Sequence, residues 1–102
     1  MNKLLIFLAA LFAFGNVQAA DAAAGETKAA VCVACHGVNG KAPILETYPK
    51  IGGQNAAYID IAVKAYKSGE RGGGNSALMT PIVSALSDSD IADIAAYFSS
   101  VE

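Results

Sequence analysis

The stretch Cys32-Val33-Ala34-Cys35-His36 decides how the rest of this chain is read. Two cysteines separated by two residues and followed at once by a histidine form the pattern of c-type haem attachment. The two-residue gap lets both thiols add to neighbouring vinyl groups of a porphyrin from one turn of backbone. The histidine is then carried beneath the ring, where its imidazole can bind the iron from the proximal side. The motif therefore predicts one covalently attached haem c and its iron.

Other chemistries of two nearby cysteines fit this chain less well. A thioredoxin-like redox pair needs a βαβ setting, and no segment alternates convincingly as a strand would. A zinc site usually needs four good ligands, whereas the chain offers only Cys32, Cys35 and His36 besides carboxylates. A plain disulfide between the two cysteines stays open as an alternative, although it leaves His36 unexplained.

The first nineteen residues differ from the rest of the chain. Lys3 gives a positively charged start, residues 4–14 form an apolar run, and Val17-Gln18-Ala19 ends in small residues. This pattern is typical of a secretory signal peptide. The apolar run of eleven falls short of the roughly 20 residues that span a bilayer. We expect cleavage after Ala19, or after Ala20, and no stable membrane insertion afterwards.

Removal of residues 1–19 leaves a mildly acidic domain, residues 20–102, which we expect in the periplasm. It has six basic and nine acidic side chains, a net charge of −3. No basic stripe is present to meet phosphates, which argues against nucleic acid as a partner. A domain of about 83 residues builds only a small core from its side chains. A large apolar cofactor would complete that core.

The rest of the sequence predicts an all-α fold, with about three main helices and long loops wrapped around the haem. The first helix is expected from Asp21, its N-cap, to about Ala34. Gly25 lies inside this helix and favours a close crossing with another helix. Residues 37–54 and 70–86 are rich in glycine and proline and are expected to be loops.

A second helix is expected over residues 55–68 and ends at Gly69. Asp60 precedes Lys64 by four residues, the favourable order for an ion pair on the exposed face. The predicted apolar face consists of Tyr58, Ile61, Ala62 and Ala65.

The third helix, residues 88–101, has the clearest signals. Ser87 and Asp90 form a capping box, with Leu86 and Ile91 at the hydrophobic-staple positions. The apolar stripe expected to face the core consists of Ile91, Ile94, Ala95 and Phe98.

The numbers of histidines and methionines limit the candidates for the second axial ligand of the iron. After residues 1–19 are removed, the chain holds one histidine, His36, and one methionine, Met79. We expect Met79 to lie in a flexible segment, from which its thioether reaches the far face of the ring and binds the iron. A thioether favours ferrous iron and raises the reduction potential. Iron held on both faces has no open site for oxygen or peroxide, so we expect an electron carrier and not an enzyme.

The chain closely resembles the class I cytochromes c, and most of all their small bacterial periplasmic members, including single halves of the dihaem cytochromes. The residues that carry this resemblance are Cys32-Val33-Ala34-Cys35-His36-Gly37, Tyr48-Pro49-Lys50-Ile51-Gly52-Gly53-Gln54, Tyr58, Gly69, Met79 and Leu86-Ser87-Asp88. The match covers essentially the whole mature chain. Because the chain has only one C-x-x-C-H motif, we expect a monohaem protein.

The resemblance implies a few helices around one haem, with the N- and C-terminal helices crossing where Gly25 meets Tyr97 or Phe98. It implies thioether bonds from Cys32 and Cys35, and His36 with Met79 as the axial pair. It also implies that the carbonyl of Pro49 accepts the proximal imidazole N–H, a contact that orients the ligand.

The expected function is the transfer of single electrons by Fe(II)/Fe(III) cycling. The expected partners are redox proteins, such as a membrane complex, a dehydrogenase, an oxidase or a reductase, and the chain is expected to be a monomer. A dedicated cytochrome subunit of a periplasmic oxidoreductase is one alternative. A haem gas sensor, in which Met79 leaves the iron, is another.

Overall fold

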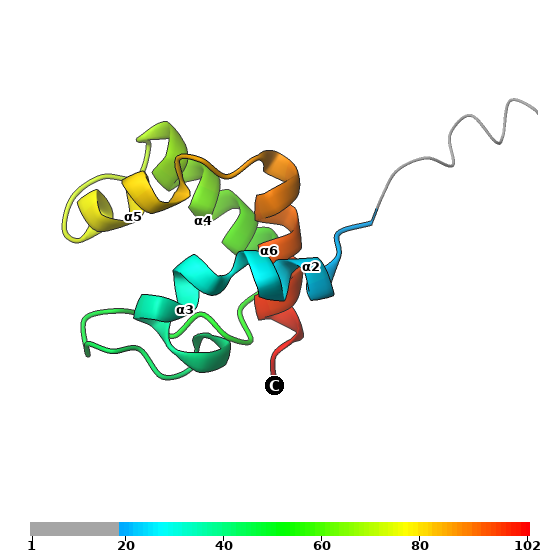
Figure 1. The fold of residues 1–102 in the computed structure, drawn as a ribbon. Helices are drawn as coiled ribbons and strands as arrows, with labels where there is room; N and C mark the ends of the chain where they lie inside the picture. The colour runs from blue at the N-terminus through cyan, green and yellow to red at the C-terminus, as the bar shows by residue number, and fades with distance from the viewer. Residues whose placement is uncertain (1–18) are drawn as a thin grey trace, which may run out of the picture.

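The computed structural model describes residues 19–102, and all regular elements in this range are helical (Figure 1). In order they are α2 (Ala22–Lys28), α3 (Ala30–His36), the 3-10 turn η1 (Val38–Gly40), α4 (Ala56–Ser68), α5 (Ser76–Val83) and α6 (Asp88–Ser100). The expected all-α fold class is therefore confirmed. The predicted signal peptide, residues 1–19, lies outside the described residues except for Ala19. Within residues 19–102, no helix has the length and apolar character needed to cross a membrane.

The first predicted helix is divided into α2 and α3, so the expectation of one continuous helix is wrong. Asp21 caps α2 as expected, and its carboxylate accepts from the backbone N–H groups of Ala23 and Ala24 at 3.0 and 3.1 Å. The break falls at Ala29, which is completely buried. The Ala29 carbonyl accepts from Cys32 N at 2.8 Å, which tightens the turn before α3 continues to His36.

α2 crosses α6 at Gly25 (Figure 1). A Cβ atom at this position would lie 1.9 Å from the carbonyl oxygen of Asp93 and 3.0 Å from the backbone nitrogen of Ile94. Only glycine allows the two backbones to approach this closely. The predicted close crossing is present, but it falls on Asp93 and Ile94. The atoms nearest to Gly25 belong to Asp93 and Ile94, one helical turn before the expected Tyr97 and Phe98.

Polar contacts also stabilise the crossing of α2 and α6. Lys28 Nζ lies 3.0 Å from Asp90 Oδ1 and 2.7 Å from Asp93 Oδ2. The backbone N–H of Asp21 donates to Asp93 Oδ1 at 2.9 Å. Asp93, on α6, therefore binds both ends of α2.

α4 begins at Asn55, whose side chain accepts from Ala57 N at 2.9 Å, and ends at Gly69 in the left-handed conformation (φ 85°). The predicted Asp60–Lys64 pair is confirmed at 2.9 Å. The predicted apolar face is wrong, because Ile61 is 68% exposed while Ile59 is only 7% exposed. The rotation arises because Ile59 and Val63 pack against the core that α6 supplies.

α5 occupies the middle of the segment predicted as the second loop, so that prediction is wrong. Pro81 lies inside α5 and cannot donate a backbone hydrogen bond. The short helix is held nevertheless, because Val83 is 1% exposed in the core and Thr80 Oγ1 donates to the carbonyl of Tyr66 at 3.0 Å. Met79 therefore lies on a helix and not in a flexible segment.

α6 is the centre of the core, and its capping box is confirmed. Ser87 Oγ accepts from Asp90 N, and Asp90 Oδ2 accepts from Ser87 N, both at 3.0 Å. All four apolar residues predicted for its buried stripe are buried. The buried apolar residues of the described chain are Ala29, Ile59, Val83, Ile91, Ile94, Ala95, Tyr97 and Phe98.

The first predicted loop, residues 37–54, is irregular apart from η1 and is fastened to α6. Tyr97 Oη donates to Asn39 Oδ1 at 2.8 Å, and Gly53 N donates to the Phe98 carbonyl at 2.8 Å. These two attachments lie on either side of Pro49. They fix the position of its carbonyl relative to the helices.

Candidate functional site

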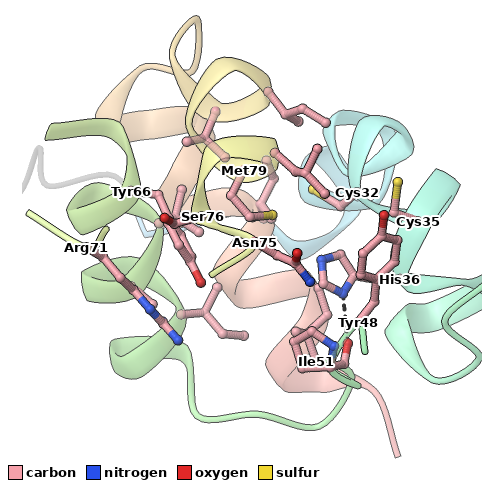
Figure 2. Close-up of a pocket in the computed structure, with 18 of the residues that line it drawn as sticks. Cys32, Cys35, His36, Tyr48, Ile51, Tyr66, Arg71, Asn75, Ser76 and Met79 are labelled. Atoms are coloured by element: carbon pink, nitrogen blue, oxygen red, sulfur yellow. Dashed lines mark hydrogen bonds between the residues drawn. The ribbon is translucent and has the colours of Figure 1, made fainter. Parts of the chain in front are cut away.

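One large cavity of about 730 Å³ gathers the residues singled out by the sequence. Its walls come from α3, residues 47–51, α4, residues 71–76, α5 and α6. This volume lies within the range of about 300–1,000 Å³ that is typical of ligand sites. Cys32, Cys35 and His36 face it from α3, and Met79 reaches it from α5 (Figure 2).

His36 ends α3 and is 7% exposed. Its Nδ1 lies 2.7 Å from the carbonyl oxygen of Pro49. Because a carbonyl can only accept, Nδ1 must carry the hydrogen, and in the neutral imidazole the lone pair then lies on Nε2. The contact between His36 and Pro49 that the resemblance implied is therefore present.

Cys32 and Cys35 are both free thiols. Burial raises the pKa of the Cys32 thiol to about 11, and the neighbouring Cys35 adds to the shift. Across residues 19–102, no cluster of three histidine, cysteine or acidic side chains is arranged to hold a metal ion. Cys32, Cys35 and His36 therefore do not converge on one point as zinc ligands would.

The remaining wall of the cavity is apolar and unusually exposed. Tyr58 and Leu78 are 47% and 52% exposed, although both line the cavity. Val31 and Ile82 share this property. Apolar side chains of this size around a hollow suit a large apolar group. A haem c fits this donor set and this wall.

The Cytochrome c family model matches residues 22–102. The chain belongs to the cytochrome c family. It is 59% identical over 86 residues to cytochrome c-554(548) of Halomonas halodenitrificans, with 82% of this chain and 100% of that protein covered. It is 47% identical over 102 residues to cytochrome c4 of Pseudomonas aeruginosa, with 98% of this chain and 49% of that protein covered.

The fold agrees with a crystal structure of reduced recombinant cytochrome c4 from Pseudomonas stutzeri. The TM-score is 0.67 at 27% identity, and the alignment covers 85% of this chain and 53% of the other. The chain thus spans about half the length of both cytochromes c4 and the whole of the c-554(548) protein. The expected resemblance to class I cytochromes c and the expected haem c are confirmed. Members of this family are electron carriers.

Sequence reasoning missed several residues of the cavity wall. Tyr58 was assigned to the core face of α4 but lines the cavity, and Arg71 was left without a role. Thr80, which fastens α5 to α4, was not singled out. Apolar residues with helical spacing could have indicated α5: Leu78, Met79, Ile82 and Val83. Pro81 within this segment disfavours a helix, so the segment was predicted as a loop.

Proposed function

We propose that this cytochrome c carries single electrons in the periplasm between respiratory or dehydrogenase partners. One observation supports the proposal most strongly: Cys32, Cys35, His36 and Met79 line a single cavity. A haem c bound there supplies an iron that alternates between Fe(II) and Fe(III). In this proposal residues 1–19 are the signal peptide and residues 20–102 form the cytochrome domain.

His36 and Met79 are the proposed axial pair. The Nδ1–H of His36 donates to Pro49, so this carbonyl holds the imidazole plane and directs Nε2 towards the cavity. Met79 contributes a soft thioether, which favours the reduced iron and so raises the potential. Cys32 and Cys35 hold the cofactor covalently through its vinyl groups.

The innermost part of the wall keeps water away from the cofactor. Ile59, Val83 and Phe98 line the cavity and are nearly or completely buried. An apolar, preformed wall changes little when the charge of the iron changes. Fast electron exchange needs this property, because a site that must rearrange slows the transfer.

A visible spectrum of the purified protein in both redox states tests the ligand assignment. We expect sharp c-type bands in the reduced state and the far-red band of a sulfur–ferric iron bond in the oxidised state. A colourless protein made in a host able to mature cytochromes c contradicts the proposal.

Carbon monoxide separates a carrier from a gas sensor. With Met79 bound to the iron, the reduced protein at neutral pH is expected to resist carbon monoxide. Rapid and complete binding would instead favour the sensor.

Gel filtration separates a free shuttle from a dedicated subunit. We expect the native protein to elute alone, at the size of about 83 residues. Co-elution with a dehydrogenase or another large partner would favour the subunit role.

A further inference from the structure

α5 carries Met79, the proposed ligand of the iron, and few contacts hold this helix to the rest of the chain. Within α5, Val83 is the residue that is buried. Gly72, Gly73 and Gly74 lie in the connection from α4, and a Cβ added at any of them would meet no other part of the described chain within 4 Å. Glycines in open space turn easily. The position of Met79 therefore depends on a small number of bonds.

The side chain next to Met79 makes one of these bonds. Thr80 Oγ1 lies 3.0 Å from the carbonyl oxygen of Tyr66, in the last turn of α4, and 3.2 Å from the carbonyl oxygen of Ser76, in the first turn of α5. A hydroxyl has one hydrogen to donate, so the two carbonyls compete for it. The bond to Tyr66 joins the two helices, which lie side by side (Figure 1), whereas the bond to Ser76 stays within α5.

This choice of two acceptors makes separation of α5 from α4 inexpensive. If α5 moves away, the Thr80 hydroxyl retains the Ser76 carbonyl as its acceptor. The Tyr66 carbonyl also retains a donor, because Gly69 N lies 3.3 Å from it. Separation therefore loses the modest net contribution of one hydrogen bond and leaves neither group without a partner.

A second bond holds the chain after α5. Lys67 Nζ, on the last turn of α4, donates to the carbonyl of Leu86, which precedes the N-cap of α6. Lys67 is exposed, so water competes for this bond, whereas the Thr80 bond is partly buried. Thr80 is also the direct neighbour of Met79. It is therefore the stronger candidate for control of the methionine.

We propose that Thr80 is a positioning residue, whose hydrogen bond to the Tyr66 carbonyl holds Met79 at the cavity and sets how often Met79 leaves the iron. This inference rests on the proposed ligation of the iron by His36 and Met79. With the hydroxyl on Tyr66, α5 stays packed on α4 and both axial positions remain filled. With the hydroxyl on Ser76 alone, α5 can turn about the glycines, and a small ligand gains access to the cavity. The Thr80 hydroxyl thus determines how well this carrier excludes small ligands.

The experiment measures the slow binding of carbon monoxide to the reduced, mature holoprotein at saturating gas, where departure of Met79 limits the rate. Thr80→Val removes the hydroxyl and preserves the shape of the side chain, whereas Thr80→Ser retains the hydroxyl. Ser84→Ala is the matched control, because it removes a hydroxyl at the end of the same helix, whose bond of 2.9 Å to the Pro81 carbonyl does not reach α4. Lys67→Met tests the competing bond.

We expect Thr80→Val to bind carbon monoxide roughly 3- to 10-fold faster than the wild type, the factor that corresponds to loss of one net hydrogen bond. The far-red band of the oxidised protein should also disappear at a lower temperature. Thr80→Ser and Ser84→Ala should stay within about 2-fold of the wild-type rate, since the interhelical bond is retained. A wild-type rate in Thr80→Val overturns the proposal, as does an equal increase in Thr80→Ser or Ser84→Ala, or an increase found only in Lys67→Met.

Gly25→Ala distinguishes positioning of Met79 from a general loss of stability. It weakens the crossing of α2 and α6 and leaves the contacts of α5 intact, so we expect a rate near that of the wild type. Faster binding in Gly25→Ala than in Thr80→Val would mean that general unfolding releases Met79, which contradicts the proposal. The wild-type spectrum tests the proposed function by itself: absence of the far-red band contradicts the ligation, whereas a normal band with an unchanged rate in Thr80→Val contradicts only this inference.

Discussion

Met79 is the residue whose replacement separates the proposed carrier from other haem proteins. In the proposed ligation, Met79→Ala removes the thioether and opens the sixth position of the iron. We expect the potential to fall by on the order of 0.2 V, within the roughly 0.8 V range that axial ligands control. The protein should stay red, with its haem covalently attached, and should bind carbon monoxide when reduced. Redox titration and visible spectroscopy measure these changes.

Leu78→Ala is the control, because Leu78 lines the same cavity and is next to Met79. It should retain the far-red absorption band. Survival of that band in Met79→Ala shows that Met79 is not the ligand.

At the scale of residues, the sequence identified side chains that the structure places around one cavity, because the residue types allow few choices. After residues 1–19 the chain has one histidine, one methionine and only two cysteines, which are separated by two residues, so few other choices existed. The sequence did not identify Tyr58 and Arg71 as cavity residues. Tyr58 lines the cavity because of how α4 is rotated, and Arg71 because the chain turns back over the end of α4. No pattern of spacing encodes that rotation.

At the scale of elements, the α2–α6 crossing gives a sharp prediction. Gly25→Ala places a Cβ 1.9 Å from the Asp93 carbonyl oxygen, so the two helices must separate. We expect the free energy of unfolding to fall by about 3 kcal/mol, at the upper end of typical overpacking costs. Chemical denaturation of the holoprotein measures this loss.

Gly72→Ala is the matched control, since a Cβ there meets nothing within 4 Å. It should change stability by less than about 1 kcal/mol. Equal losses in both variants would mean that the crossing is not close.

The first turn of α6 predicts a dependence of stability on acid. Hydrogen bonds from the Ser87 backbone, from Lys28 and from the Ser87 hydroxyl lower the pKa of Asp90 to about 2 from 3.8. The pKa of Asp93 is lowered by its bonds to Asp21 and Lys28. A lowered pKa in the folded state stabilises the fold above the unfolded value, and this stabilisation is lost as the pH falls from about 4 through 2.

Asp90→Asn should therefore be less stable than the wild type at pH 7, with the difference shrinking as the pH falls from 4 towards 2. Urea unfolding at several pH values measures this. Asp88→Asn removes a charge of the same sign from the same turn and controls for the change in net charge. A difference for Asp90→Asn that stays constant with pH contradicts the assignment.

The elements themselves were predictable to different degrees. α6 and α4 have capping residues and periodic apolar positions, so their bounds follow from local sequence. α5 was missed because Pro81 disfavours a helix locally, whereas the burial of Val83 and the Thr80 hydrogen bond come from tertiary contacts. The break at Ala29 has the same origin, since it depends on packing and not on a helix-breaking residue.

For the whole molecule, the haem is expected to be part of the core. The described chain surrounds a cavity of about 730 Å³ with apolar side chains that are exposed without a cofactor. Replacing Cys32 and Cys35 together by alanine should abolish stable haem retention and cooperative unfolding. Near-ultraviolet circular dichroism should lose its fixed signals while much helical signal is retained.

Cys35→Ala alone leaves one thioether and is the control. It should retain haem and a cooperative, although weaker, transition. A colourless double variant that still unfolds cooperatively would show that the side chains alone complete the core.

The attachment of α5 through Thr80 has a consequence for biosynthesis. The proximal half, with α2, α3, α4 and α6, is fastened by the Gly25 crossing and by the bonds of the 37–54 loop, all of which can form without α5. We therefore expect α5, which the Thr80 bond and the buried Val83 side chain hold in place, to open more readily than α6, which would let an assembly enzyme reach the thiols. Amide hydrogens of α5 should then exchange with deuterium faster than those of α6 in the finished protein.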